Sequence, residues 1–132
     1  MLRLSLLVAT YNRSASLLGA LESVAGQRAD PAVWECVVVD NNSQDDTAAC
    51  VEAFRQARPG LNLRLVRESR QGLSHARNRG IAESRGEYLA IIDDDERINP
   101  DFVRAYIDFF DTHPEAAAAG GRIIAELSLI HI

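Results

Sequence analysis

Apolar and polar positions follow two alternating patterns along the chain. Short runs of aliphatic and β-branched residues, such as Val37–Val39 and Leu89–Ile92, are typical of strands. The longer stretches between them carry apolar residues every three or four positions, which predicts amphipathic helices. The order is β-α-β-α-β-α-β-α-β. We expect strands near Leu2–Ala9, Glu35–Asp40, Leu61–Val66, Tyr88–Asp93 and Ala116–Ala125.

Capping and turn residues predict the limits of four helices. The first should begin at Ser14, the second at an N-cap on Ser43, and the fourth at Pro100. The third should run over Leu73–Ser84 and be ended by Gly86. We expect the fourth helix to turn its aromatic residues toward the sheet: Phe102, Tyr106, Phe109 and Phe110.

Strands that are apolar at nearly every position suit a sheet covered by helices on both faces. The sequence therefore predicts an α/β fold with a mostly parallel, Rossmann-like sheet. The chain shows no internal repeat and no linker, so we expect residues 1–132 to form one domain or part of one.

The composition narrows the range of partners. The chain has 14 basic and 19 acidic residues in 132, a net charge of −5 and a pI near 5.1, so we expect no nucleic-acid partner. All its basic residues are arginines. The spacing of Cys36 and Cys50 is not that of paired zinc ligands, so we expect both to be small buried hydrophobic residues. The apolar run 4–9 is too short for a membrane span or a signal peptide. We expect a cytoplasmic protein, with the inner face of the membrane as a second location.

Polar residues follow four of the predicted strands, at 10–13, 40–43, 68–72 and 93–96. Ligands of open parallel sheets bind beyond the carboxyl ends of the strands, so these segments should share one edge. The sharpest is Asp93–Glu96, whose clustered carboxylates suit Mg²⁺ or Mn²⁺ completed by water and phosphate oxygens. The alternative is a solvated acidic turn before the fourth helix.

Two further features could contribute to a nucleotide site. Asp40 ends an apolar strand and could accept hydrogen bonds from a base or ribose; the alternative is an Asx-turn. Residues 64–85 hold six arginines, and guanidinium groups match phosphate oxygens. Of that segment, Arg77 and Asn78 are the favoured candidates for binding a diphosphate.

These segments resemble nucleotide-sugar glycosyltransferases of family 2, which have the GT-A fold. The resemblance rests on four motifs in order: Val8–Arg13, Val38–Thr47, Gly72–Gly80 and Gly86–Asp95. It implies transfer of a sugar from a nucleotide-diphospho-sugar, with UDP favoured, to a carbohydrate or glycolipid hydroxyl, usually with inversion. It also implies Mn²⁺ or Mg²⁺ as cofactor.

The resemblance assigns roles residue by residue. Asp40 would contact the base, Arg77 the ribose or phosphates, and Asp93 and Asp95 the metal. The residues implied in nucleotide-sugar binding are Thr10, Tyr11, Arg13, Asp40, Asn42, Arg77, Asp93 and Asp94.

Two other classes of protein also carry acidic residues at strand ends: receiver domains, which act in signalling, and aspartyl-phosphate phosphatases, which are enzymes. Both require a lysine that this chain lacks. We expect a C-terminally truncated domain without the acceptor-binding half, and with the catalytic base beyond residue 132. Such a chain would be inactive alone, and the remaining alternative is a non-catalytic nucleotide-binding fragment. Its apolar last strand should then promote self-association.

Overall fold

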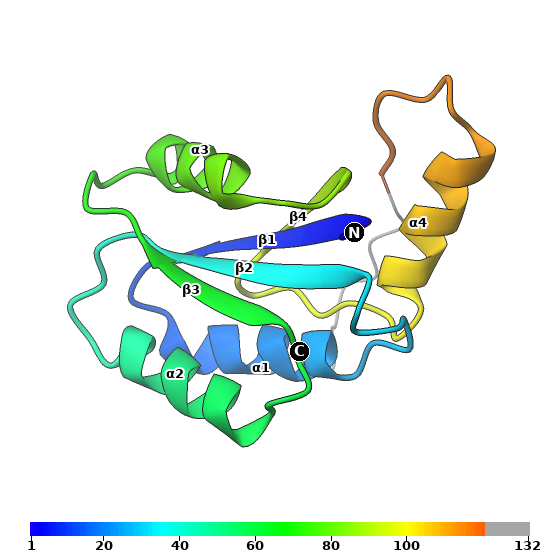
Figure 1. Ribbon diagram of the computed structural model, residues 1–132. Helices are drawn as coiled ribbons and strands as arrows, with labels where there is room; N and C mark the ends of the chain where they lie inside the picture. The colour runs from blue at the N-terminus through cyan, green and yellow to red at the C-terminus, as the bar shows by residue number, and fades with distance from the viewer. Residues whose placement is uncertain (121–132) are drawn as a thin grey trace, which may run out of the picture.

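The computed structural model describes residues 1–120, in which strands and helices alternate from the first strand to the last helix (Figure 1). The strands are β1 (Leu4–Thr10), β2 (Trp34–Asp40), β3 (Leu63–Arg67) and β4 (Tyr88–Asp93). The helices are α1 (Ser14–Ala25), α2 (Thr47–Ala57), α3 (Leu73–Glu83) and α4 (Phe102–Thr112).

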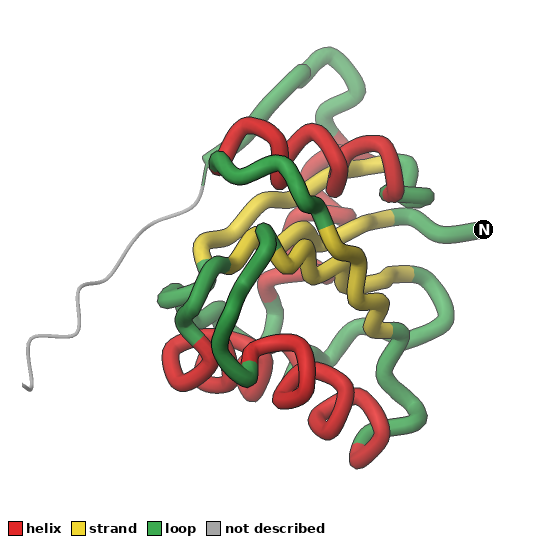
Figure 2. The backbone as a smooth tube through the Cα atoms, turned by 90° about the vertical axis from the view of Figure 1, so that its left-hand side faces the viewer, coloured by secondary structure: helices red, strands yellow, loops and turns green. Residues whose placement is uncertain are grey.

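The four strands form one parallel sheet in the order β3-β2-β1-β4. Thr10 lies opposite Asp40, and Ala9 lies opposite Asp93, so the carboxyl ends of β1, β2 and β4 meet at one edge. Helices α1 and α2 lie on one face and α3 on the other, as Figures 1 and 2 show. The predicted α/β fold with a parallel, two-sided sheet is therefore confirmed.

Alternate residues of the strands enter two separate cores. On β1, Leu4, Leu6 and Val8 belong to the larger core, which packs against α1, α2 and α4. Leu7 points the other way and packs with Val37, Val39 and Ala76 of α3. This arrangement explains why the strands are apolar at nearly every position: burial on both faces removes the usual polar alternation.

Three predicted element limits are wrong. The second helix begins at Thr47, so its N-cap position is Asp46 rather than Ser43. The Thr47 amide donates to Asp45 Oδ1 at 3.0 Å. The fourth helix begins at Phe102, two residues after Pro100. Residues 116–120 of the expected fifth strand are not in a strand, and the rest of it, with its expected self-association, lies outside the described residues.

The aromatic residues of α4 are less buried than predicted. The two buried residues are Val103 and Ile107, whereas Phe109 is 36% exposed. Phe102 and Tyr106 pack at the margin of the larger core, and Phe110 lies against the ring of Tyr88. The aliphatic side chains Val103 and Ile107 thus enter the core, while three of the four aromatic side chains lie half-buried around them and Phe109 faces outward.

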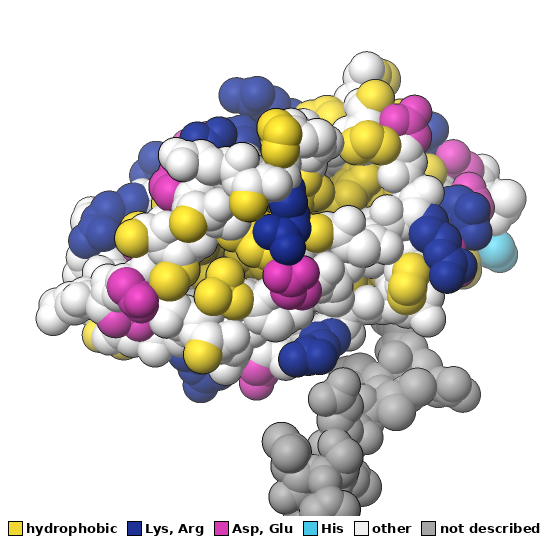
Figure 3. Space-filling model, turned by 90° about the horizontal axis from the view of Figure 1, so that it is seen from below, with side chains coloured by type: hydrophobic (Ala, Val, Ile, Leu, Met, Phe, Trp, Pro, Cys, Tyr) yellow, Lys and Arg dark blue, Asp and Glu magenta, His cyan; other side chains and the backbone are white. Residues whose placement is uncertain are grey.

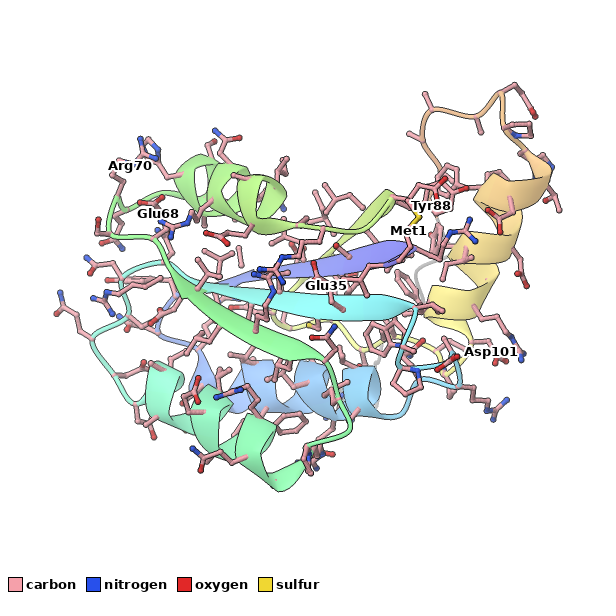
Figure 4. The ribbon with its side chains drawn as sticks, in the orientation of Figure 1. Met1, Glu35, Glu68, Arg70, Tyr88 and Asp101 are labelled. Atoms are coloured by element: carbon pink, nitrogen blue, oxygen red, sulfur yellow. The ribbon has the colours of Figure 1, made fainter. Side chains whose placement is uncertain are left out.

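At the amino end of the sheet, a buried carboxylate ties the strands to the segment between α3 and β4. Glu35 is 1% exposed and accepts hydrogen bonds from Ser5 Oγ at 2.8 Å, the Arg85 amide at 3.0 Å and Arg64 Nε at 3.2 Å (Figure 4). Burial by itself raises the pKa of Glu35, but these hydrogen bonds more than offset it and hold the pKa below its ordinary value.

Glu35→Gln should therefore destabilise the fold more at neutral pH than in acid. A group with a depressed folded pKa stabilises the fold above its unfolded pKa, and that contribution is lost as the pH falls through the folded pKa. We expect a loss of about 1–3 kcal/mol at pH 7, shrinking below roughly pH 4. Urea denaturation at both pH values measures it. Glu52→Gln, which alters an exposed pair with Arg55, is the matched control; a pH-independent difference between wild type and Glu35→Gln would contradict the prediction.

The face formed by α1 and α2 is mixed in character. Figure 3 shows arginine and acidic side chains interspersed with apolar ones on this side of the molecule. Within residues 1–120, no helix has the length and apolar character needed to cross a membrane.

Candidate functional site

A cavity of about 480 Å³ opens at the carboxyl edge of the sheet. Its walls come from the ends of β1, β2 and β4, from the loop after β3 and from the first turns of α3. The lining residues are Ala9, Thr10, Tyr11, Arg13, Asn41, Gln71, Gly72, Leu73, Ala76, Asp93, Asp94 and Asp95. The structure thus brings the four polar strand ends together, as predicted.

The three aspartates after β4 have different surroundings. Asp94 is buried; its carboxylate accepts Thr10 Oγ1 at 2.9 Å and lies 3.5 Å from Arg13 Nη1. The side chains of Asp93 and Asp95 are 60% and 58% exposed. Asp94 is therefore committed to joining β4 to β1, whereas its two neighbours present carboxylates at the cavity.

The donor chemistry at this point fits a hard divalent cation. Mg²⁺ and Mn²⁺ are commonly bound by one or two protein carboxylates, with water and phosphate oxygens completing the coordination shell. The exposed carboxylates of Asp93 and Asp95 are ligands of this type. Across residues 1–120, no three His, Cys, Asp or Glu side chains come together as a metal-binding group.

Asp40 lies beneath the cavity rather than in its lining. It is 1% exposed, its Oδ1 accepts the Ser43 amide at 3.0 Å, and its Oδ2 lies 3.6 Å from Arg67 Nη1. The contact with Ser43 ties Asp40 to the loop after β2, as a turn-forming role requires, but it reaches three residues ahead rather than the two of an Asx-turn. Asn42, which has a φ of 67°, also lies outside the lining and accepts Arg67 Nη2 at 2.7 Å. Contacts of Asp40 and Asn42 with a nucleotide stay predictions.

Arg77 lies on α3 at the margin of the cavity. Its Nη2 is 3.4 Å from Asp93 Oδ1, and its Nε is buried without a hydrogen-bond partner among the described residues. The exposed end of the guanidinium, rather than the enclosed Nε, is the part of Arg77 that a ligand can reach. Asn78, the neighbouring candidate, is exposed and does not line the cavity.

The arginines of residues 64–85 are mostly paired within the chain. Arg64 lies near Glu35 and Glu83, Arg70 near Glu68, and other pairs are Arg67 with Asp40, Arg77 with Asp93 and Arg79 with Glu83. A second cavity of about 550 Å³ beside β3 is lined by four arginines, all of them among the residues with acidic partners. This second cavity therefore offers little uncompensated positive charge to an anion.

Asn41 lines the cavity although sequence reasoning did not single it out. It is 5% exposed, and its amide reaches across to the loop after β3. The only sequence signal was its place in the Asp-Asn-Asn-Ser segment, which predicts a turn at that strand end but not which asparagine points inward.

The parallel sheet and the cavity with an acidic rim at its carboxyl edge define an α/β domain with a candidate ligand site beyond the strand ends. The Glycosyl transferase family 2 profile matches residues 5–129, and the chain belongs to this family. The succinoglycan biosynthesis protein ExoO of Rhizobium meliloti is 36% identical over 120 residues, which cover 90% of this chain and 31% of ExoO.

Solved structures agree with this assignment. TarS of S. aureus in complex with UDP-GlcNAc superposes with a TM-score of 0.79 and 27% identity, over 98% of this chain and 39% of that one. The mannosyltransferase PcManGT from Pyrobaculum calidifontis, in complex with GDP-Man and Mn²⁺, has a TM-score of 0.77 and 30% identity, over 82% of this chain and 32% of its own. The GT-A fold is thereby confirmed. The chain spans less than half the length of these relatives.

Proposed function

We propose that this chain is the donor-binding part of a glycosyltransferase and binds a UDP-linked sugar in the cavity at the carboxyl edge of the sheet. The observation that carries the proposal is that the exposed Asp93 and Asp95 carboxylates at the cavity each lie beside a guanidinium group. Arg77 Nη2 is 3.4 Å from Asp93 Oδ1, and Arg13 Nη1 is 3.8 Å from Asp95 Oδ2. A protein commonly binds a diphosphate through a divalent cation and through guanidinium groups. This wall offers carboxylates that can hold the cation and guanidinium groups that can bind the phosphate oxygens. The TarS structures with UDP-GlcNAc and UDP support the choice of nucleotide.

We assign the parts of such a donor to different residues around the cavity. Tyr11, which is 40% exposed, and Thr10 lie at the end of β1, where they would face the nucleoside. Arg13 and Arg77 would face the phosphates, and Asp40 would contact the base from beneath. The chain would hold the donor by these side chains while Asp94 keeps the acidic segment fixed to β1.

Asp93 and Asp95 would hold Mn²⁺ or Mg²⁺. When bound, that ion would neutralise the charge that develops on the departing nucleoside diphosphate. The Mn²⁺ named with GDP-Man in the PcManGT structure supports this cofactor.

Transfer also needs an acceptor hydroxyl and a base to take its proton. We propose that the sugar passes to a carbohydrate or glycolipid hydroxyl with inversion, and that the acceptor site and the base lie outside this chain. Support comes from the chain covering 20–31% of ExoO and TarS. Chain 1–132 would then bind the donor without transferring the sugar.

Calorimetric titration with UDP tests the proposal. We expect binding in the presence of Mn²⁺ and a clear loss of affinity in EDTA; no binding in either condition would refute the proposed nucleotide site.

The same titration on Asp40→Asn separates base contact from turn formation. Base contact predicts about tenfold weaker UDP binding with stability retained. If the variant binds UDP as tightly as the parent, Asp40 serves only the turn.

A further inference from the structure

One wall of the cavity is a loop, residues 68–72, that connects β3 to α3. Gln71 and Gly72 of this loop line the cavity. At its two ends, the Glu68 amide donates to the Asp40 carbonyl at 2.9 Å, and the Gly72 carbonyl accepts the Ala76 amide at 3.1 Å. Between these points the loop takes its shape from side chains.

Asn41 makes the contacts that cross from β2 to this loop. Its Nδ2 donates to the carbonyls of Arg70 at 2.8 Å and Glu68 at 3.3 Å, and its Oδ1 accepts the Gly72 amide at 2.9 Å. Its own amide donates to the Thr10 carbonyl at 2.8 Å, which fixes the residue to β1. One side chain thus joins three successive parts of the loop to the centre of the sheet.

The loop conformation needs such a restraint. Gly72 has a φ of 137° and a ψ of 139°, a backbone region that is essentially restricted to glycine. Because glycine can adopt many other backbone conformations, the loop could take other shapes without a restraint. The second restraint is Glu68, whose carboxylate accepts the Arg70 amide at 2.9 Å and lies beside the Arg70 guanidinium. Figure 4 shows Glu68 and Arg70 together at the start of α3. This contact stays within the loop, so it cannot set the distance from the loop to the sheet.

We infer that Asn41 is a positioning residue of the nucleotide pocket, an inference that rests on the proposed function. Both amide hydrogens of Asn41 are used by loop carbonyls, so the side chain has no donor left for a ligand. It acts instead by holding Gln71, Gly72 and the first turn of α3 against the ends of β2 and β1. That turn leads to Arg77, which faces Asp93 across the cavity margin.

Two variants test the inference in the 132-residue chain. Asn41→Ala removes the donors and the acceptor together, while Asn41→Asp keeps an acceptor for the Gly72 amide but turns a carboxylate toward two carbonyls. Each should weaken UDP binding in Mn²⁺ about tenfold or more, the cost of losing one or two buried hydrogen bonds. Asn62→Ala, which alters an exposed asparagine just before β3, is the matched control and should bind UDP like the parent.

Amide hydrogen exchange supplies a readout that a general loss of stability would not reproduce. In Asn41→Ala, the Gly72 amide should exchange at least about tenfold faster, while amides of β1 and β2 keep their protection. Loss of protection throughout the sheet would overturn the inference, because it would assign Asn41 to overall stability. Unchanged exchange at Gly72, or UDP affinity equal to the parent's, would also overturn it. Failure of the parent to bind UDP refutes the proposed function instead, and exchange at Gly72 still decides whether Asn41 holds the loop.

Discussion

Replacing Asp95 by alanine should reduce the affinity for UDP in Mn²⁺ at least about tenfold and leave the affinity in EDTA unchanged. The Asp95 side chain is 58% exposed at the cavity, and its nearest charged contact is a weak one, with Arg13 Nη1 at 3.8 Å. Its carboxylate is therefore free to serve a cation, and loss of even an outer-shell partner commonly costs a metal site ten- to a hundredfold in affinity. Calorimetry with Mn²⁺ and with EDTA measures both values.

The matched control is Asp108→Ala, an exposed aspartate on α4. Asp111 on the same helix is unsuitable, although it appears equivalent in the sequence. Its carboxylate accepts hydrogen bonds from Arg3 and from the Tyr88 hydroxyl, so its loss would loosen α4 from the sheet. An equal drop in affinity with and without Mn²⁺ would show that Asp95 contacts the nucleotide directly, and the metal assignment would fail.

Gly86→Ala should lower the free energy of unfolding by about 3 kcal/mol or more. A Cβ at this position would lie 2.5 Å from the Leu4 carbonyl carbon and the Ser5 amide nitrogen, which are backbone atoms of the central strand β1. The Gly86 amide also donates to Ser5 Oγ at 2.7 Å, so the chain cannot move away without losing that bond. Overpacking commonly costs 1–3 kcal/mol, and rigid backbone leaves little room to relax.

Gly60→Ala is the control for this substitution, because no atom lies within 4 Å of its added Cβ. It should change stability by no more than about 0.5 kcal/mol. Urea denaturation of the two variants beside the parent gives the comparison. Similar midpoints for all three would mean that the close approach of Gly86 to β1 does not constrain the fold.

The sequence predicted the sheet and the convergence of its strand ends because these depend on local signals. Apolar runs fix the strands, and parallel pairing places their carboxyl ends together whatever the details of the loops. The acidic segment and the β1 end were found in this way, and Thr10, Asp93 and Asp95 do line the cavity. The family resemblance, confirmed by the match over residues 5–129, rests on these same segments.

The predictions that failed depend on contacts between distant parts of the chain. In α4 an aromatic stripe and an aliphatic stripe lie side by side, and the packing of Val103 and Ile107 against the sheet decides between them. The inward direction of Asn41 likewise depends on carbonyls about thirty residues away. The sequence also did not show that Asp40 lies buried 3.6 Å from Arg67 of β3, although its contact with a nucleotide stays a prediction.

The network around Glu35 lies at the amino end of the strands whose carboxyl ends form the cavity. Protein engineering can therefore treat the two ends separately. Substitutions around Ser5, Arg64 and Arg85 would tune heat resistance and expression yield while the choice of donor sugar stays the same. Under the proposed function, substitutions of Tyr11 and Leu73, which are 40% and 54% exposed at the cavity, would change donor binding without opening the core. A library that diversifies the cavity could accordingly be built on a parent already stabilised at the opposite end.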